Sequence, residues 1–230
     1  MEVESEKVMM DDCVVSGKNE KINPKVLDKP AYYFITRVID IVGSLIGIIL
    51  LSPIFVITGI LIKLETREGP IIFSQNRVGK NGKVFKMYKF RSMHVDAEER
   101  LKELLTFNEV EGAMFKMKDD PRITKIGKFI RKSSIDELPQ LFNVLGGEMS
   151  LVGPRPPLER EVKEYTEYDL QRLLVKPGCT GLWQVSGRNS VGFDEMVELD
   201  IQYIESMSFL WDIKILFKTV RVVLFPNDAY

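Results

Sequence analysis

Two adjacent carboxylates, Asp136 and Glu137, are the side chains of this sequence best suited to chemistry. They lie in SSIDELPQLFNVLGG, residues 133–147, whose composition predicts a helix that begins near the acidic pair. Free amides and the positive end of a helix dipole favour anions, so they hold a carboxylate ionised and attract a phosphate beside it. Because two carboxylates and a phosphate repel one another, Mg²⁺ is the expected third component. The pair therefore favours a reaction on phosphate.

The same segment also has a purely structural interpretation. Ser134 and Glu137 have the spacing of a capping box, Pro139 favours a first helical turn, and Gly146-Gly147 favours the end of the helix. Under this interpretation Asp136 and Glu137 only satisfy the amides of a helix N-terminus. The spacing alone leaves both interpretations open.

Several basic residues are placed to offset phosphate charge. Arg131 shortly precedes the acidic pair. Two stretches rich in glycine and proline, residues 150–157 and 176–189, each present one arginine, Arg155 or Arg188. A rigidly held guanidinium makes forked contacts with phosphate, although such stretches are also typical of ordinary turns.

Composition restricts the remaining chemistry. The chain has 230 residues, 45% hydrophobic and 28% charged, so it can bury the core of about one or two domains. A single histidine and two distant cysteines exclude an HExxH site, a Cys/His metal set and a disulfide framework, and they favour a reducing compartment. The net charge of −1 gives no global bias toward nucleic acid, which is not expected as a partner.

The elements that must position the acidic pair begin with an apolar segment. Residues 41–62 carry no formal charge over 22 positions, enough for a hydrocarbon core of roughly 30 Å. Ser52-Pro53 near the middle predicts a break, and basic residues flank both sides, which disfavours a spanning helix. We therefore expect a re-entrant helix with both ends in the cytoplasm; a kinked spanning helix and a buried core helix are the alternatives. Arg37 and Asp40 have the spacing of a helical ion pair that would anchor the segment at the headgroups.

The remaining pattern predicts an α+β fold that is mostly helical. Apolar residues at 71–73 and 84–90 flank an Asn-Gly pair, which predicts a small β-hairpin with a two-residue loop. Residues 96–105 predict a charged, solvated helix. Two basic amphipathic segments, residues 121–132 and 209–225, are expected to lie on the membrane surface, with a core-packed helix as the alternative for each.

Longer motifs connect these features. They are KVFKMYKFRSM at residues 83–93, DPRITKIGKFIRKSSIDELPQLFNVLGGEMSLVGPRP at 120–156, KPGCTGLWQVSGRN at 176–189 and ELDIQYIESMSFLWDIKI at 198–215. In this order they resemble the monotopic bacterial phosphoglycosyl transferases, which are polyprenyl-phosphate sugar-1-phosphate transferases of polysaccharide and glycan assembly. The resemblance covers residues 30–226, and the chain looks like the compact catalytic form of that family.

The resemblance and the charge pattern together give the expected organisation. It comprises a mobile acidic tail over 1–29, a re-entrant membrane helix over 30–67 with its break at Ser52-Pro53, a catalytic domain on the membrane surface over 68–226, and a short tail over 227–230. The expected location is the bacterial inner (cytoplasmic) membrane, with the catalytic domain facing the cytoplasm.

The resemblance also implies a reaction. Asp136 matches the family's nucleophile, which attacks the β-phosphorus of a UDP-sugar, releases UMP and carries the sugar-1-phosphate as a covalent intermediate. Undecaprenyl phosphate then accepts the sugar-1-phosphate from this intermediate. Glu137 matches the carboxylate associated with Mg²⁺, the expected cofactor.

The resemblance places further residues in or beside the site. Arg91 stands where some relatives have lysine. With Arg188 from its constrained loop, the expected substrate-binding residues are Lys89, Arg91, Arg131, Arg155, Asp200 and Arg188.

Two other functions use the same features. A membrane-anchored, Mg²⁺-dependent phosphohydrolase would release free sugar phosphate without a lipid acceptor. A non-enzymatic adaptor would bind lipid regardless of Asp136. The motifs favour the transferase, and they leave open the sugar, the pathway, the role of the tail and the oligomeric state, a homo-oligomer included.

Overall fold

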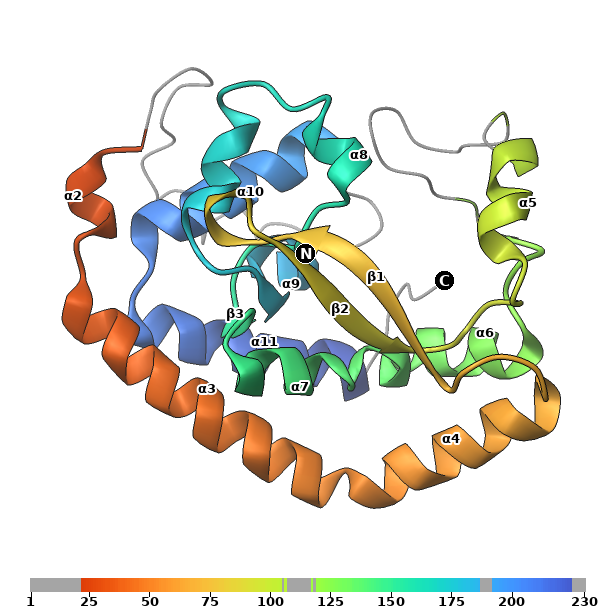
Figure 1. The fold of residues 1–230 in the computed structure, drawn as a ribbon. Coiled ribbons are helices and arrows are strands. Elements are labelled where there is room, and N and C mark those ends of the chain that lie inside the picture. Colours follow the sequence, from red (N-terminus) through yellow and green to blue (C-terminus); the bar gives the residue numbers. More distant parts are fainter. Residues whose placement is uncertain (1–21, 105, 107–116, 118, 187–191, 225–230) are drawn as a thin grey trace, which may run out of the picture.

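The computed structural model describes residues 22–104, 106, 117, 119–186 and 192–224 (Figure 1). This part of the chain is mostly helical and contains two small sheets, in agreement with the predicted α+β class. The elements, in chain order, are α2 (Pro24–Leu27), α3 (Pro30–Leu50), α4 (Ser52–Glu65), β1 (Ile72–Val78), η1 (Lys80–Gly82), β2 (Val84–Phe90), α5 (Ala97–Leu104), α6 (Lys125–Lys132), η3 (Ile135–Glu137), α7 (Gln140–Gly146), β3 (Ser150–Val152), α8 (Glu159–Val162), η4 (Asp169–Leu174), β4 (Gly178–Thr180), α9 (Leu182–Ser186), α10 (Phe193–Ser206) and α11 (Phe209–Leu224).

A broken helix forms the base of the molecule, with α3 and α4 meeting in a shallow V (Figure 1). The two helices join at Leu51, whose backbone (φ −91°, ψ 2°) departs from helical geometry. Pro53 follows directly in the first turn of α4, where its missing amide hydrogen interrupts the hydrogen-bond ladder of α3. Ser52 Oγ donates to the carbonyl of Ile49 at 2.8 Å, across the break. The predicted break at Ser52-Pro53 is confirmed.

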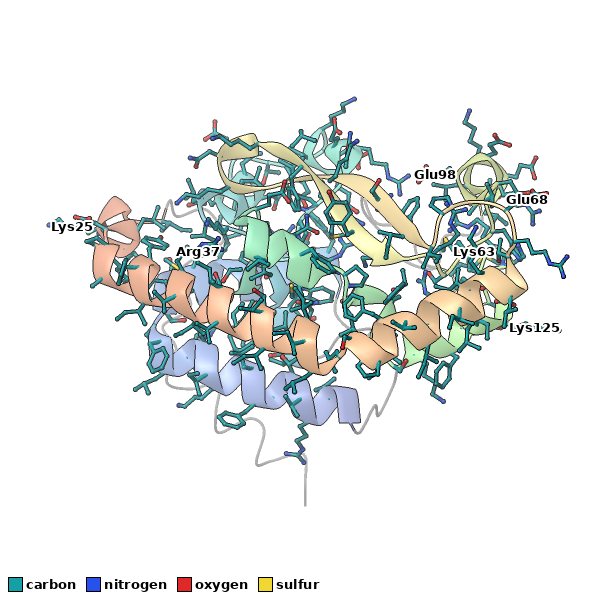
Figure 2. All side chains as sticks on the ribbon, turned by 60° about the horizontal axis from the view of Figure 1, so that its bottom comes forward. Lys25, Arg37, Lys63, Glu68, Glu98 and Lys125 are labelled. Atoms are coloured by element: carbon teal, nitrogen blue, oxygen red, sulfur yellow. The ribbon has the colours of Figure 1, made fainter. Side chains whose placement is uncertain are left out.

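Apolar side chains are exposed along the whole underside, which Figure 2 turns toward the viewer. Of the helices that the structure describes, α3 alone is long and apolar enough to cross a membrane, judged by length and composition, and little of it is buried. An exposed apolar surface this continuous is unfavourable in water and marks an interaction site. The most exposed of these side chains are Phe34, Ile49 and Leu50 of α3, Val56 and Leu64 of α4, and Leu210 and Phe217 of α11.

The predicted amphipathic helices form. Helix α11 lies beside α3 at the base (Figure 1). Its apolar side chains Leu210, Phe217 and Val220 are exposed. Helix α6 packs Ile126 and Ile130 against the domain and exposes Phe129 on its outer side. The solvated charged helix also forms, as α5. Their position on a bilayer stays a prediction.

The β-hairpin forms with a longer loop than predicted. Strands β1 and β2 pair antiparallel from Ile72 opposite Phe90 to Val78 opposite Val84. The loop runs from Gly79 to Lys83, and the Gly79 amide donates to the Lys83 carbonyl at 2.8 Å. Asn81 and Gly82 occupy the left-handed positions (φ 56° and 76°), but they do so inside a 3₁₀ turn. The prediction of a two-residue loop is therefore wrong.

The two glycine- and proline-rich stretches contain a second sheet that the sequence did not indicate. Strands β3 and β4 pair in parallel, with Ser150 opposite Gly178 and Val152 opposite Thr180. A Cβ atom at Gly178 would lie 2.1 Å from the Gly153 amide nitrogen, so glycine here permits the two backbones to approach. Arg155 lies in the segment that follows β3.

The first described residues belong to the packed domain. Ile22 is buried in the main core, which is built largely from α10, and α2 packs against that helix. Residues 22–29 are therefore part of the fold, although the sequence placed them in the acidic tail; the rest of that tail and the 227–230 tail lie outside the described residues.

The predicted Arg37–Asp40 pair is wrong. Arg37 Nη1 and Nη2 donate to carbonyls in the last turn of α7, those of Val144 (2.6 Å) and Leu145 (2.8 Å). The Asp40 carboxylate instead accepts from the Leu151 amide at 2.8 Å, in β3. Each side chain finds a tertiary partner that helical spacing could not reveal, and each ties α3 to the packed domain.

Candidate active site

The acidic pair lies in a 3₁₀ turn, η3, between α6 and α7 and against β2 (Figure 1). Ser134 precedes it in a left-handed conformation (φ 56°), which reverses the chain before Asp136. Helix α7 begins only at Gln140, after Pro139, and ends at Gly147 as predicted (φ 87°). The carboxylates therefore stand on a tight turn ahead of the helix.

The predicted capping box does not form. Ser134 makes no side-chain capping hydrogen bond. The Glu137 carboxylate accepts a hydrogen bond from Lys89 Nζ of β2 at 2.7 Å instead. A hydrogen bond between a carboxylate and an ammonium group is stronger than one between a carboxylate and a neutral backbone amide, because both partners are charged. The structural interpretation of the pair as helix caps therefore loses its main support.

The two carboxylates have different surroundings. Asp136 is 7% exposed, whereas the Glu137 side chain is 37% exposed. Burial, and then the charge of Glu137, raise the pKa of Asp136 to about 6, against the opposing charges of Lys89 and Arg131. The expectation that helix amides hold this carboxylate ionised is thus outweighed by desolvation. Above a pH of about 6 Asp136 is a buried anion beside two cations.

A second basic group lies next to this pair. Arg155 approaches the buried Glu161 carboxylate at 3.6 Å, between Nη1 and Oε2. Arg77 of β1 is buried near both Arg155 and Glu137, and burial followed by the Arg155 charge lowers its pKa to about 9. Its Nη1 donates to the Pro156 carbonyl at 3.0 Å, while its Nε is buried without a hydrogen-bond partner.

Sequence reasoning missed Arg77 as a site residue. In the sequence Arg77 is simply one of the basic residues that follow the apolar segment. Its position in β1, opposite Phe85, turns it inward toward the loop that carries Arg155. A buried arginine in a strand was the signal, but burial is not visible in the sequence.

Asp200 reaches the site only through another residue. Its fully buried carboxylate accepts from Arg172 Nε at 2.8 Å, and the two form an ion pair with both side chains 1% exposed. Arg172 also donates from Nη1 to the Tyr165 hydroxyl (2.7 Å) and from Nη2 to the Arg155 carbonyl (3.3 Å). Asp200 therefore supports the loop of Arg155 from behind. Arg172 and Tyr165 carried no signal in the sequence.

The remaining predicted residues lie elsewhere. The Arg91 guanidinium packs against Gly69, where a Cβ atom would lie 2.2 Å from Arg91 Nη1, and its Nε and Nη1 are buried without hydrogen-bond partners. Arg188 falls outside the described residues. The structure thus brings Lys89 and Arg131 to the acidic pair. Arg155 is connected to the pair through Arg77, and Asp200 is connected to the Arg155 backbone through Arg172. Arg91 instead packs against Gly69.

The donor set suits a metal that is held partly by substrate. In the described part of the chain no group of three or more His, Cys, Asp or Glu side chains could hold a metal ion. Mg²⁺ usually takes one or two protein carboxylates and completes its shell with water and phosphate oxygens. Asp136 and Glu137 fit that pattern, with Glu137 the more accessible of the two.

Comparison with known proteins gives a consistent set of matches. The family model described as "Bacterial sugar transferase" matches residues 31–226. The chain is similar to a galactosyl transferase of Streptococcus agalactiae (53% identity, covering 87% of this chain and 44% of the relative) and to an undecaprenyl-phosphate galactose phosphotransferase of Salmonella typhimurium (48%, covering 89% and 43%). It is also similar to an exopolysaccharide production protein of Rhizobium meliloti (39%, covering 84% and 87%). The chain therefore spans less than half of the first two relatives and most of the third.

Proposed function

This chain belongs to the bacterial sugar transferase family, and from that premise we propose that it transfers a sugar-1-phosphate from a UDP-sugar to undecaprenyl phosphate. The names of relatives support this reaction, among them an undecaprenyl-phosphate galactose phosphotransferase and an undecaprenyl-phosphate glucose phosphotransferase. The single observation that carries the mechanism is the buried Asp136 beside Glu137, Lys89 and Arg131.

Galactose is the sugar to test first. Three relatives at 48 to 53% identity are named for galactosyl, galactose or UDP-galactose transfer. Relatives at 40 to 42% identity are named for N-acetylgalactosamine or glucose. The order of similarity thus favours UDP-galactose as the donor.

Asp136 acts as the nucleophile in this proposal. Its carboxylate oxygen forms a bond to the β-phosphorus, the bond from that phosphorus to the bridging oxygen breaks, and UMP leaves with the electron pair. An oxygen of undecaprenyl phosphate then attacks the same phosphorus, which frees the Asp136 carboxylate and gives the lipid diphosphosugar. A carboxylate already removed from water loses little further hydration when it attacks, because its burial was accomplished by folding.

The other groups neutralise charge and hold the donor. Glu137 would hold Mg²⁺, which when bound offsets the negative charge of the diphosphate. Lys89 and Arg131 balance the acidic pair, as their effect on the Asp136 pKa indicates. Arg155 is placed for a forked contact with phosphate, and Arg172, fixed by Asp200, holds the backbone of its loop.

We place the broken helix in one leaflet, with the catalytic domain on the cytoplasmic side. The support is that both ends of the segment bind the same domain. Near the start of α3, the Tyr32 hydroxyl donates to Asp212 of α11 at 2.8 Å. At the end of α4, Glu65 accepts from the first amides of α6. Single cysteines beside Lys29 and Lys63 should therefore be labelled from the same side; labelling from opposite sides contradicts this placement.

The covalent step has a direct test. Purified protein in nanodiscs is incubated with UDP-galactose and Mg²⁺ without an acceptor, and UMP release and intact mass are recorded. We expect a gain of one hexose phosphate per chain, discharged by undecaprenyl phosphate and absent in Asp136→Asn. Asp119→Asn, at an exposed carboxylate, is the matched control and should form the adduct normally. Free galactose-1-phosphate released without acceptor would indicate a phosphohydrolase, and a requirement for both substrates at once would exclude the two-step mechanism.

A further inference from the structure

The catalytic turn lies between two helices whose far ends are each held by a different half of the broken helix. Glu65, the last residue of α4, accepts from the first two amides of α6: Oε1 from Lys125 (2.8 Å) and Oε2 from Ile126 (2.9 Å). At the other side, Arg37 of α3 donates to two carbonyls in the last turn of α7, those of Val144 and Leu145. Figure 2 shows Arg37 and Lys125 toward opposite ends of the molecule, on the two sides of α6 and α7. We call Glu65 and Arg37 the clamp.

The charges of the clamp match the helix ends that they hold. A carboxylate is favoured at a helix N-terminus, and a guanidinium is favoured at a C-terminus. Glu65 takes the first two amides of α6, and the Thr124 side chain takes the amide of Gly127 at 2.8 Å. The fork of Arg37 spans two adjacent carbonyls, a geometry that a lysine cannot reproduce. The contacts of Glu65 and Arg37 therefore fix the orientation of α6 and α7 as well as their distance from the broken helix.

Apolar packing makes the region between clamp and turn rigid. The Phe55 ring of α4 packs at a tilt against Phe90 of β2 and edge-on against Phe142 of α7. On the other side, a Cβ atom at Gly47 of α3 would lie only 3.1 Å from Leu141, so α3 and α7 are in close contact. The cluster beneath the turn comprises Ile62, Phe90 and Ile130, with Phe55, Ile71, Ile126, Ile135 and Leu138 packed on it. A rotation of either half of the broken helix must therefore move the turn.

We propose that Glu65 and Arg37 are positioning residues that fix the height of Asp136 above the bilayer for the acceptor step. This inference rests on the proposed function, because it distinguishes the two substrates. A nucleotide sugar diffuses in water and can follow the site if the site moves. The phosphate of a polyprenyl acceptor is kept at headgroup height by its tail, so a displaced Asp136 misses it.

The clamp therefore predicts a selective defect. In Glu65→Gln and Arg37→Lys, loading from UDP-galactose should stay within about twofold of wild type. Discharge by undecaprenyl phosphate should slow by on the order of ten- to a hundredfold, the loss expected for a misplacement of about 1 Å. Glu68→Gln, at an exposed carboxylate near the same helix end (Figure 2), should change neither step.

A short, water-soluble prenyl phosphate separates positioning from general damage. It is not tied to headgroup height, so the clamp variants should discharge to it at the wild-type rate. Equal slowing with both acceptors would show a merely structural role and would overturn the inference. Equal discharge to undecaprenyl phosphate by variant and wild type would overturn it as well.

A depth measurement tests the clamp without turnover. A spin label at Lys132→Cys, at the exposed end of α6, reports its depth in nanodiscs by power saturation in a background without other cysteines. We expect the label to shift or spread in depth in the two clamp variants and to stay fixed in Glu68→Gln. If wild type forms no adduct, the proposed function fails; an unchanged label depth in both clamp variants refutes the clamp separately.

Discussion

Replacing the buried carboxylate with its neutral isostere should stabilise this protein. Burial raises the pKa of Asp136 from 3.8 to about 6. A shift of about two pH units corresponds to ~3 kcal/mol of free energy of unfolding, because one unit is about 1.4 kcal/mol. Asp136 is almost fully buried, so solvent screening removes little of this value. Asp136→Asn should therefore gain up to ~3 kcal/mol at pH 8, or roughly 6–12 °C in Tm for a chain of this size.

The gain must depend on pH in a defined way. The pKa of Asp136 is higher in the folded state than in the unfolded state, so burying this group destabilises the fold only when the group is ionised. The loss of free energy of unfolding is therefore absent below pH 3.8 and reaches its full value only above a pH of about 6. At pH 5 the advantage of Asp136→Asn should be about half of its value at pH 8. Thermal unfolding in nanodiscs with a chelator present, at both pH values, measures it, with Asp119→Asn as the exposed control. A variant no more stable than wild type at pH 8, or equally stabilised at both pH values, refutes the desolvated carboxylate.

Two further predictions concern the site. The rate of UMP release without acceptor should rise with pH through about 6, because Asp136 must lose its proton to attack; a rate that stays constant between pH 5 and 7.5 would mean that Asp136 is not the attacking group. Asp200→Asn leaves the Arg172 guanidinium buried without its counter-charge and should lower the free energy of unfolding by ~3–5 kcal/mol. Denaturant unfolding measures it, and replacing both residues with Met and Leu should recover most of the loss; no recovery would mean that packing is responsible.

Local chemistry in the sequence predicted several features because each depends on neighbouring residues. Pro53 breaks a helix through its own missing amide hydrogen, and the break was therefore visible without a fold. The end of α7 at Gly147 follows from the positive φ that glycine permits. The acidic pair itself was recognised from residue type and from the motifs around it.

Contacts between distant segments account for what the sequence could not predict. Arg37 and Asp40 have ideal spacing for a helical pair, yet tertiary partners in α7 and β3 replace it. Glu137 has capping-box spacing, yet Lys89 from a strand far along the chain takes its carboxylate. Arg77 joins the site only because β1 turns it inward. For Arg37, Asp40 and Glu137, a partner brought by the fold replaces the local one that the spacing predicts.

The unequal surroundings of the acidic pair argue for unequal roles. Two titratable groups whose environments differ usually divide the tasks of a site. Glu137 is the more exposed carboxylate and already accepts a hydrogen bond from the Lys89 ammonium. These properties suit a group that exchanges Lys89 for Mg²⁺ when the metal and the diphosphate bind. Asp136 is buried, and its raised pKa makes it more basic than an ordinary aspartate and a more reactive oxygen nucleophile once it is ionised. Exchanging the two environments would give a hydrated nucleophile and a desolvated metal ligand, both poorer at their tasks, so the geometry favours Asp136 as the attacking group.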